Sequence, residues 1–258
     1  MALPIPDYLV TFESTMRALI IVAALALIWA GASRMEGRAS SRYVTAGLLS
    51  VVLIVWVVLA QRLGAANTYL AATDNQPPSI GLPLAILLPL TLAAAGIWNS
   101  RHVMRLISAV PLWSLVAIQT YRVAGGIFVL LWAGGRLPWQ FALPAGIGDV
   151  IAGCSAVMVA ALLARKADNA PRAAYLWCVF GISDLVLAVA TGLLTSPGPF
   201  HLLALAAPNR LVSAYPLVMI PTFGVPLALI LHGIVLWRLR TSREESLVPD
   251  RAFAARHA

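Results

Sequence analysis

Residues 139–164, WQFALPAGIGDVIAGCSAVMVAALLA, form a long apolar run in which Asp149 is the only charged residue. A helix needs about 20 consecutive apolar residues to cross a bilayer, and it bonds all of its own backbone polar groups. The run is long enough, and its apolar residues are continuous rather than alternating, which excludes a strand of a membrane barrel. The run therefore predicts a transmembrane helix.

Similar apolar stretches lie on both sides of this run, separated by polar, turn-forming residues. Six of them qualify as spans: 18–32, 43–61, 80–98, 108–133, 173–194 and 213–237. The sequence thus predicts an all-α, polytopic membrane helix bundle of seven transmembrane helices in one domain, residues 18–237. We expect residues 1–17 to form an N-terminal tail at the membrane interface, and residues 238–258 to form a basic cytoplasmic tail.

The composition of the chain supports a membrane protein. Of its 258 residues, 60% are apolar and 11% are charged, against roughly 45–50% and 25% in a soluble domain. This excludes an ordinary cytoplasmic enzyme, a disulfide scaffold, a disordered tail and a nucleic-acid module. Cys154 and Cys178 lie in apolar runs without metal-binding spacing, so we interpret both as small buried hydrophobic residues.

Basic residues are distributed unevenly over the loops. The loops after the first, third and fifth spans and the C-terminal tail hold Arg34, Arg38, Arg42, Arg101, Arg105, Arg165, Lys166, Arg172, Arg238, Arg240, Arg243, Arg251 and Arg256. The opposite side holds Arg17, Arg62, Arg136 and Arg210. Because cytoplasmic loops are enriched in Lys and Arg, we predict an external N-terminus and a cytoplasmic C-terminus. The net charge of +8 then implies membrane lipid as a partner of the tail, and no nucleic acid.

Tryptophan residues mark the predicted span ends. Trp98, Trp177 and Trp237 fall at predicted cytoplasmic ends. Because the indole ring has an apolar body and a polar N–H group, tryptophan prefers the membrane–water interface. We expect all three in an interfacial belt.

Three charged residues lie well inside predicted spans: Arg122, Asp149 and Asp184. Each costs about 2.5–3.5 kcal/mol at the centre of an inserted helix. They should therefore face inward and contact one another or water, with Gln119 and Tyr121 adding polar groups nearby. This Arg/Asp cluster is the candidate site.

The cluster has two general interpretations. In the first, it binds or passes a small solute or ion: Arg122 pairs with a carboxylate or holds an anionic group, one aspartate balances its charge, and the other changes protonation state. In the second, it is a structural lock that fixes helix register in a sensory or partner-binding membrane protein. The scattered histidines predict no haem or metal site, and we expect no cofactor and no catalytic residue.

A short motif introduces a third interpretation. Gly146, Gly148 and Asp149 resemble the Gly-x-Gly-Asp signature of intramembrane aspartyl proteases and prepilin peptidases, and the resemblance implies Asp184 as the second carboxylate of a pair that shares a proton. The order of the two aspartates is reversed here relative to those families. Arg122 at the same depth would pair with both carboxylates, which opposes the sharing of a proton.

The predicted last span contains three prolines at intervals of five residues, Pro216, Pro221 and Pro226, together with His232. Proline removes a helical hydrogen bond and kinks a helix, and freed carbonyls are tolerated in a membrane where they line a cavity or find donors. We interpret the segment as a kink or gate beside the cluster, and we expect His232 to bond a neighbouring carbonyl.

Three segments resemble a family of bacterial multi-pass inner-membrane proteins with about seven spans. They are QTYR at 119–122, FALPAGIGD at 141–149, and YPLVMIPTF at 215–223 followed by Val225, Pro226 and His232. The resemblance implies a bacterial inner-membrane protein. It implies no activity.

Overall fold

The computed structural model describes residues 5–70, 81–198 and 200–254, with side chains as far as Thr241. Every regular element in these ranges is helical. The elements are α1 (Asp7–Arg34), α2 (Ala39–Ala65), α3 (Gly81–Asn99), α4 (Arg101–Ala109), α5 (Leu112–Ala117), the 3₁₀ segment η1 (Ile118–Gly126), α6 (Ile127–Ala133), α7 (Trp139–Ala164), α8 (Ala170–Thr195), the 3₁₀ turn η2 (Leu211–Ser213), the π-helical turn η3 (Ile220–Gly224) and α9 (Val225–Ala254).

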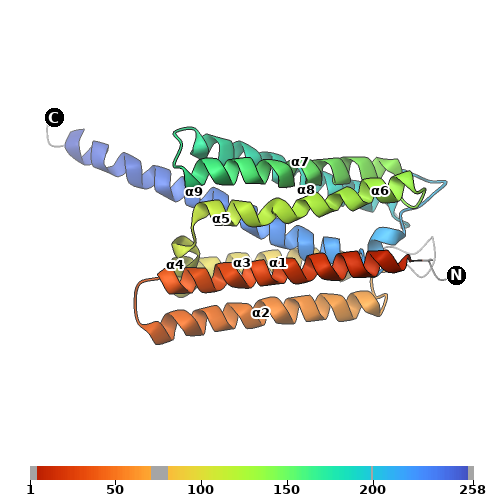
Figure 1. Ribbon diagram of the computed structural model, residues 1–258, viewed down its shortest axis with the longest axis horizontal. Helices are drawn as coiled ribbons and strands as arrows, with labels where there is room; N and C mark the ends of the chain where they lie inside the picture. The colour runs from red at the N-terminus through yellow and green to blue at the C-terminus, as the bar shows by residue number, and fades with distance from the viewer. Residues whose placement is uncertain (1–4, 71–80, 199, 255–258) are drawn as a thin grey trace.

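Seven helical segments of the described chain are long and apolar enough to cross a membrane, which confirms the predicted seven-span helical bundle. They are α1, α2, α3, the composite α5–η1–α6, α7, α8, and η3 with the first part of α9. Successive spans run in opposite directions, so the two termini lie at opposite ends of the bundle, here called the N-end and the C-end (Figure 1). The last turns of α9 project beyond the other helices at the C-end (Figure 1).

The first helix begins earlier than the sequence predicts. It starts at Asp7 rather than at residue 18, so residues 7–17 form one continuous helix with the first span. An acidic side chain in the first turn is favourable because it lies against the positive end of the helix dipole. The placement of residues 1–17 at a membrane interface stays a prediction, and residues 1–4 lie outside the described ranges. The side chains of the predicted basic tail beyond Thr241 also lie outside the described part of the structure.

The fourth span is not a regular α-helix. Two short α-helices, α5 and α6, flank the 3₁₀ segment η1, which is nine residues long. Runs of 3₁₀ helix beyond three or four residues are uncommon, and inside a longer helix they often mark a hinge or a strained segment. Arg122 lies at the middle of this segment. The local narrowing of the helix therefore coincides with the candidate site.

The prolines lie at the start of the last span. Pro216 precedes it, Pro221 lies in the π-helical turn, and Pro226 lies in the first turn of α9. Because they lie before the last span or at its start, the three prolines do not kink one continuous helix over residues 213–237. Proline is tolerated where a helix begins. Two carbonyls of this turn accept side-chain donors from other spans: Trp56 donates to Thr222 over 3.2 Å and Tyr121 donates to Gly224 over 2.9 Å.

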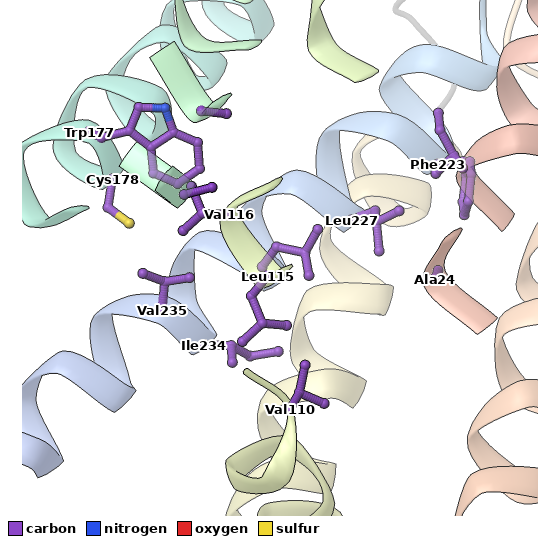
Figure 2. Close-up of a cluster of buried hydrophobic side chains, with 14 of the residues drawn as sticks. Ala24, Val110, Leu115, Val116, Trp177, Cys178, Phe223, Leu227, Ile234 and Val235 are labelled. Atoms are coloured by element: carbon purple, nitrogen blue, oxygen red, sulfur yellow. The ribbon is translucent and has the colours of Figure 1, made fainter. Parts of the chain in front are cut away.

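Four groups of buried apolar side chains pack the interior of the described chain, and two of them are large. The C-end core is the larger and includes Val116, Trp177, Cys178, Leu227 and Val235 (Figure 2). The N-end core is smaller and joins side chains of α1, α6, α7 and the segment before the last span; its members include Leu9, Phe128, Phe141, Leu211 and Leu217. Cys178 is buried, as expected, whereas Cys154 is exposed on the surface of the bundle.

Small residues bring α7 close to its neighbours. A Cβ atom added to Gly153 would lie 2.6 Å from the backbone nitrogen of Val123 in η1, so α7 reaches the 3₁₀ segment only because this residue has no side chain. Ala152 and Ala156 on α7 are fully buried. Close approach through small residues is the main device of helix association in membranes, where apolar burial alone gives little driving force. It sets Asp149 of α7 directly against η1.

Candidate functional site

Arg122 joins two aspartates from different helices. Its Nε donates to Oδ1 of Asp149 on α7 over 2.7 Å, and its Nη2 donates to Oδ2 of Asp184 on α8. The exposed fractions of the three side chains are 2% for Arg122, 6% for Asp184 and 14% for Asp149. The structure thus brings the three predicted residues together, and Asp149 is the most accessible of them.

Glycines provide the space for these side chains. A Cβ atom at Gly125 of η1 would overlap the Asp149 carboxylate, and one at Gly148 of α7 would overlap the Asp184 carboxylate. Each carboxylate therefore lies over a glycine of the adjacent element. This arrangement lets two buried ion pairs form without separating the helices, and it gives a physical reason for the Gly-x-Gly-Asp motif that does not involve proteolysis.

His232 belongs to the cluster, which the sequence did not indicate. Nη1 of Arg122 lies 3.3 Å from Nε2 of His232 and 3.4 Å from the carbonyl oxygen of Gly181. Because arginine can only donate, Nε2 of His232 is the acceptor. A Cβ atom at Gly181 would overlap the imidazole ring. Arg122 therefore contacts α7, α8 and α9 through separate nitrogen atoms, and His232 is part of this interface. A gate at the prolines stays a prediction.

Trp177 supports the histidine from the side of α8. Its ring lies 4.5 Å from the imidazole ring of His232, and its Nε1 donates to the carbonyl of Ala152 over 3.0 Å. Trp177 is 5% exposed. Its assignment to an interfacial belt is therefore wrong: the indole N–H finds its partner on α7 and the ring packs inside the bundle.

The other two predicted polar residues do not bond Arg122. Tyr121 donates to Gly224 and so ties η1 to the π-helical turn. Gln119 is fully buried, and neither its amide oxygen nor its amide nitrogen has a hydrogen-bond partner among the described residues. Unsatisfied buried amides are rare and costly. The 3₁₀ segment thus contains a buried, unsatisfied amide at Gln119 in addition to the buried charge of Arg122.

Glu13 and Arg17 of α1 form an ion pair that the sequence analysis missed. Both are buried, at 6% and 9% exposure, and their charged atoms lie 3.5 Å apart. The sequence predicts Arg17 on the external side of the membrane and Glu13 in an interfacial tail. The available signal was the spacing, since an acidic residue four positions before a basic one on a helix forms a favourable pair.

A cavity of about 70 Å³ lies between this pair and the Arg/Asp cluster. Charged side chains on its wall are Glu13, Arg17, Arg122 and Asp149, and most of the remaining wall is apolar. A cavity of roughly 10–15 Å³ already holds one water molecule, so this one holds several water-sized groups. It is lined by α1, η1, α7, α8 and the start of the last span.

The cavity lies between the two apolar cores. Leu217 on its wall belongs to the N-end core, and Phe223 and Met219 on its wall belong to the C-end core. Figure 2 shows Phe223 and Leu227 extending this C-end core toward α1. Apolar packing thus borders the polar groups of the cavity in both directions along the bundle.

The geometry disfavours an aspartyl protease. Such an enzyme needs two carboxylates that share a proton and activate water, whereas here each carboxylate binds a different nitrogen of Arg122. Among the described residues, no three His, Cys, Asp or Glu side chains gather to hold a metal ion. The chemistry that the site offers is ionic and hydrogen-bonded recognition.

Comparison with known proteins leads to a family. Neither the curated proteins nor the solved structures contain a significant match to the chain. A family model described as a domain of unknown function (DUF8737) matches residues 78–240. This range includes Arg122, Asp149, Asp184 and His232, whereas Glu13 and Arg17 precede it. Because the match covers more than half of the sequence, the chain belongs to the DUF8737 family of domains of unknown function.

Proposed function

We propose that this protein binds a small solute or ion in the cavity between the Arg/Asp cluster and α1. The observation that supports this most directly is the cavity itself, which has charged groups from three elements on an otherwise apolar wall. Charged groups inside a membrane are expensive, and where they occur they usually serve a ligand or ion pathway. A concave, mostly apolar cavity with a few convergent polar groups is also the usual form of a ligand site.

The residues of the cluster have two roles: some hold the others in position, and one contacts the bound solute. Arg122 uses three nitrogen atoms on protein partners, so its role is to hold Asp149 in place. Asp149 faces the cavity and is the most exposed of the three ionic side chains. We infer that Asp149 contacts the bound solute, and that Asp184 and His232 position Arg122.

Binding is favoured over an open pore. Apolar cores border the cavity toward both ends of the bundle, so the cavity does not form a continuous pore between the two ends. The 3₁₀ segment η1 and the π-helical turn η3 both line the cavity, and irregular turns of this kind often occur at hinges and functional sites. Transport would require these two segments to open the cavity to each end in turn.

The alternative function is a sensory or partner-binding membrane protein in which the cluster is a structural lock. One observation favours it: Arg122 joins α7, α8 and α9 at a single point, an arrangement that fixes the relative register of three spans. Buried ionic groups serve such a register role in some proteins.

We also propose that the protein lies in a bacterial inner membrane with its N-end outside and its C-end in the cytoplasm. The alternation of spans places the loops after α1, α3 and α7 at the C-end (Figure 1). These loops carry most of the basic loop residues, and basic loops face the cytoplasm. The sequence resemblance to bacterial inner-membrane proteins supports the choice of membrane.

The test is a thermal-shift screen of small anions, cations and neutral metabolites against two purified proteins. One is wild type, and the other carries Arg122→Met, Asp149→Asn and Asp184→Asn together. The triple variant should fold at least as well as wild type, because neutral replacement of a buried ion cluster is often neutral or stabilising by about 1–4 kcal/mol. A true ligand stabilises wild type by roughly 2.7 kcal/mol at a hundredfold excess over Kd, and the triple variant by nothing. If no compound distinguishes the two proteins, the structural lock becomes the better explanation.

A further inference from the structure

The ionic groups at the cavity do not balance. On the wall itself, Glu13 and Asp149 are matched by Arg17 and Arg122. Asp184, which binds Arg122 but does not line the cavity, adds a third carboxylate to these two guanidinium groups. His232 accepts a hydrogen bond from Arg122, so it adds no positive charge on this geometry. We propose that the cavity selects a small organic cation with a single positive charge, an ammonium compound with apolar substituents. This inference rests on the proposed function and specifies its ligand class.

Two carboxylates have oxygen atoms available for such a ligand. Oε2 of Glu13 and Nη1 of Arg17 lie 3.5 Å apart, and both are buried without a hydrogen-bond partner among the described residues. Arg122 binds Oδ1 of Asp149, and no described donor lies on Oδ2. A buried carboxylate oxygen without a donor costs free energy. A cationic N–H group between the two carboxylates would form charge-assisted hydrogen bonds and remove that cost.

The rest of the wall argues for an organic cation rather than a metal ion. Besides its charged groups, the cavity is lined largely by apolar side chains, among them Met16, Ile20, Leu217 and Phe223. Hard metal cations need about six or more oxygen ligands, and this wall does not supply them. An alkylammonium ion instead presents methyl or methylene groups to the apolar wall, and its charge is attracted to aromatic faces such as that of Phe223.

The volume sets the size of the ligand. A cavity of about 70 Å³ accepts a few heavy atoms. Methylammonium, ethylammonium and tetramethylammonium cover this range and differ in whether they carry N–H donors. Because the two carboxylate oxygens lack donors, we expect the primary amines to bind more tightly than the quaternary one.

The experiment measures the Tm of the purified full-length protein with each of these three chlorides, and with sodium chloride and sodium acetate at the same ionic strength. In wild type, methylammonium or ethylammonium should raise the Tm by roughly 5–10 °C at a hundredfold excess over Kd, and sodium salts should raise it by much less. An equal or larger shift with sodium chloride or with acetate overturns the proposal, and so does the absence of a shift with all three ammonium salts. The wild-type comparison alone decides this.

Two variants locate the binding. Glu13→Gln and Asp149→Asn should each abolish the ammonium shift, whereas Asp7→Asn, which changes an exposed carboxylate on the same α1 helix, should leave it intact. Unchanged shifts in a folded Glu13→Gln or Asp149→Asn protein overturn the proposal. The outcome also separates this inference from the proposed function. If an anionic or neutral solute gives a shift that depends on the cluster, the ligand class is wrong but the binding function survives. If no solute does so, both fail.

Discussion

Replacement of Arg122 by methionine is the sharpest perturbation of the cluster. The change keeps most of the side-chain volume but removes the cation that binds both Asp149 and Asp184. The two carboxylates then remain buried over Gly125 and Gly148, without a positive partner. We expect a large loss of stability, and a partial recovery when Asp184→Asn is added, because the second change removes one of the two orphaned charges.

The magnitude follows from the bonds that are lost. Two charge-assisted hydrogen bonds at about 1.5–3 kcal/mol each give a loss of about 3–6 kcal/mol, close to the ~3–5 kcal/mol typical of breaking a buried ion pair. At roughly 2–4 °C per kcal/mol for a chain of this size, Arg122→Met should lower the Tm by about 6–24 °C. Asp184→Asn alone should cost about 1–3 kcal/mol, since the amide oxygen still accepts from Arg122 and Asp149 still balances its charge.

The assay is thermal unfolding of wild type, both single variants and the double variant in the same detergent. The double variant should be more stable than Arg122→Met alone, with a coupling of up to about 3 kcal/mol. Losses that add to within about 0.5 kcal/mol would refute the reasoning, because they would mean that Arg122 and Asp184 act independently.

Three further predictions concern the surroundings and the topology. Gly148→Ala should destabilise the protein markedly, because the added methyl group overlaps the Asp184 carboxylate. Gly47→Ala should stabilise it by about 0.5–1 kcal/mol, because a Cβ atom added at this helical glycine meets nothing within 4 Å. Thermal unfolding compares the two variants. Trp177→Phe removes the indole donor to α7 and should cost about 1 kcal/mol, and an unchanged Tm would show that this bond contributes nothing. In a background without the native cysteines, Asp168→Cys should resist an impermeant thiol reagent in intact cells and Arg136→Cys should react; the reverse pattern would invert the proposed orientation.

The sequence predicts the spans well where apolar runs have clear ends. The span at 139–164 has the predicted bounds because Pro138 precedes it and a turn with basic residues follows it. The ionic cluster was also predictable, since charges at membrane depth must meet one another. The pattern of spans did not reveal the 3₁₀ segment around Arg122, although its buried residues, Gln119, Arg122 and Gly125, recur at every third position. The apolar runs on both sides are continuous and carry no periodicity that separates 3.0 from 3.6 residues per turn.

The errors share a physical cause. A residue's position along a span predicts its depth but not the direction in which its side chain points. Trp177 was therefore assigned to the interface, although it faces α7 and His232. Glu13 and Arg17 looked like part of a polar tail because charges usually end a span, but their mutual pairing allows α1 to continue through them. His232 reaches Arg122 only because Gly181 leaves room, and that contact depends on three-dimensional packing.

A variant that fills the cavity tests whether the protein binds a solute there. Ala124 lies on the cavity wall, whereas Ala161 lies on the exposed surface of α7. The measurement is the Kd, by calorimetric titration, of the compound that most stabilises wild type, determined for wild type, Ala124→Leu and Ala161→Leu. We expect Ala124→Leu to lose binding and Ala161→Leu to retain the wild-type Kd. Equal affinity of all three proteins would place the solute outside the cavity and contradict the proposed function.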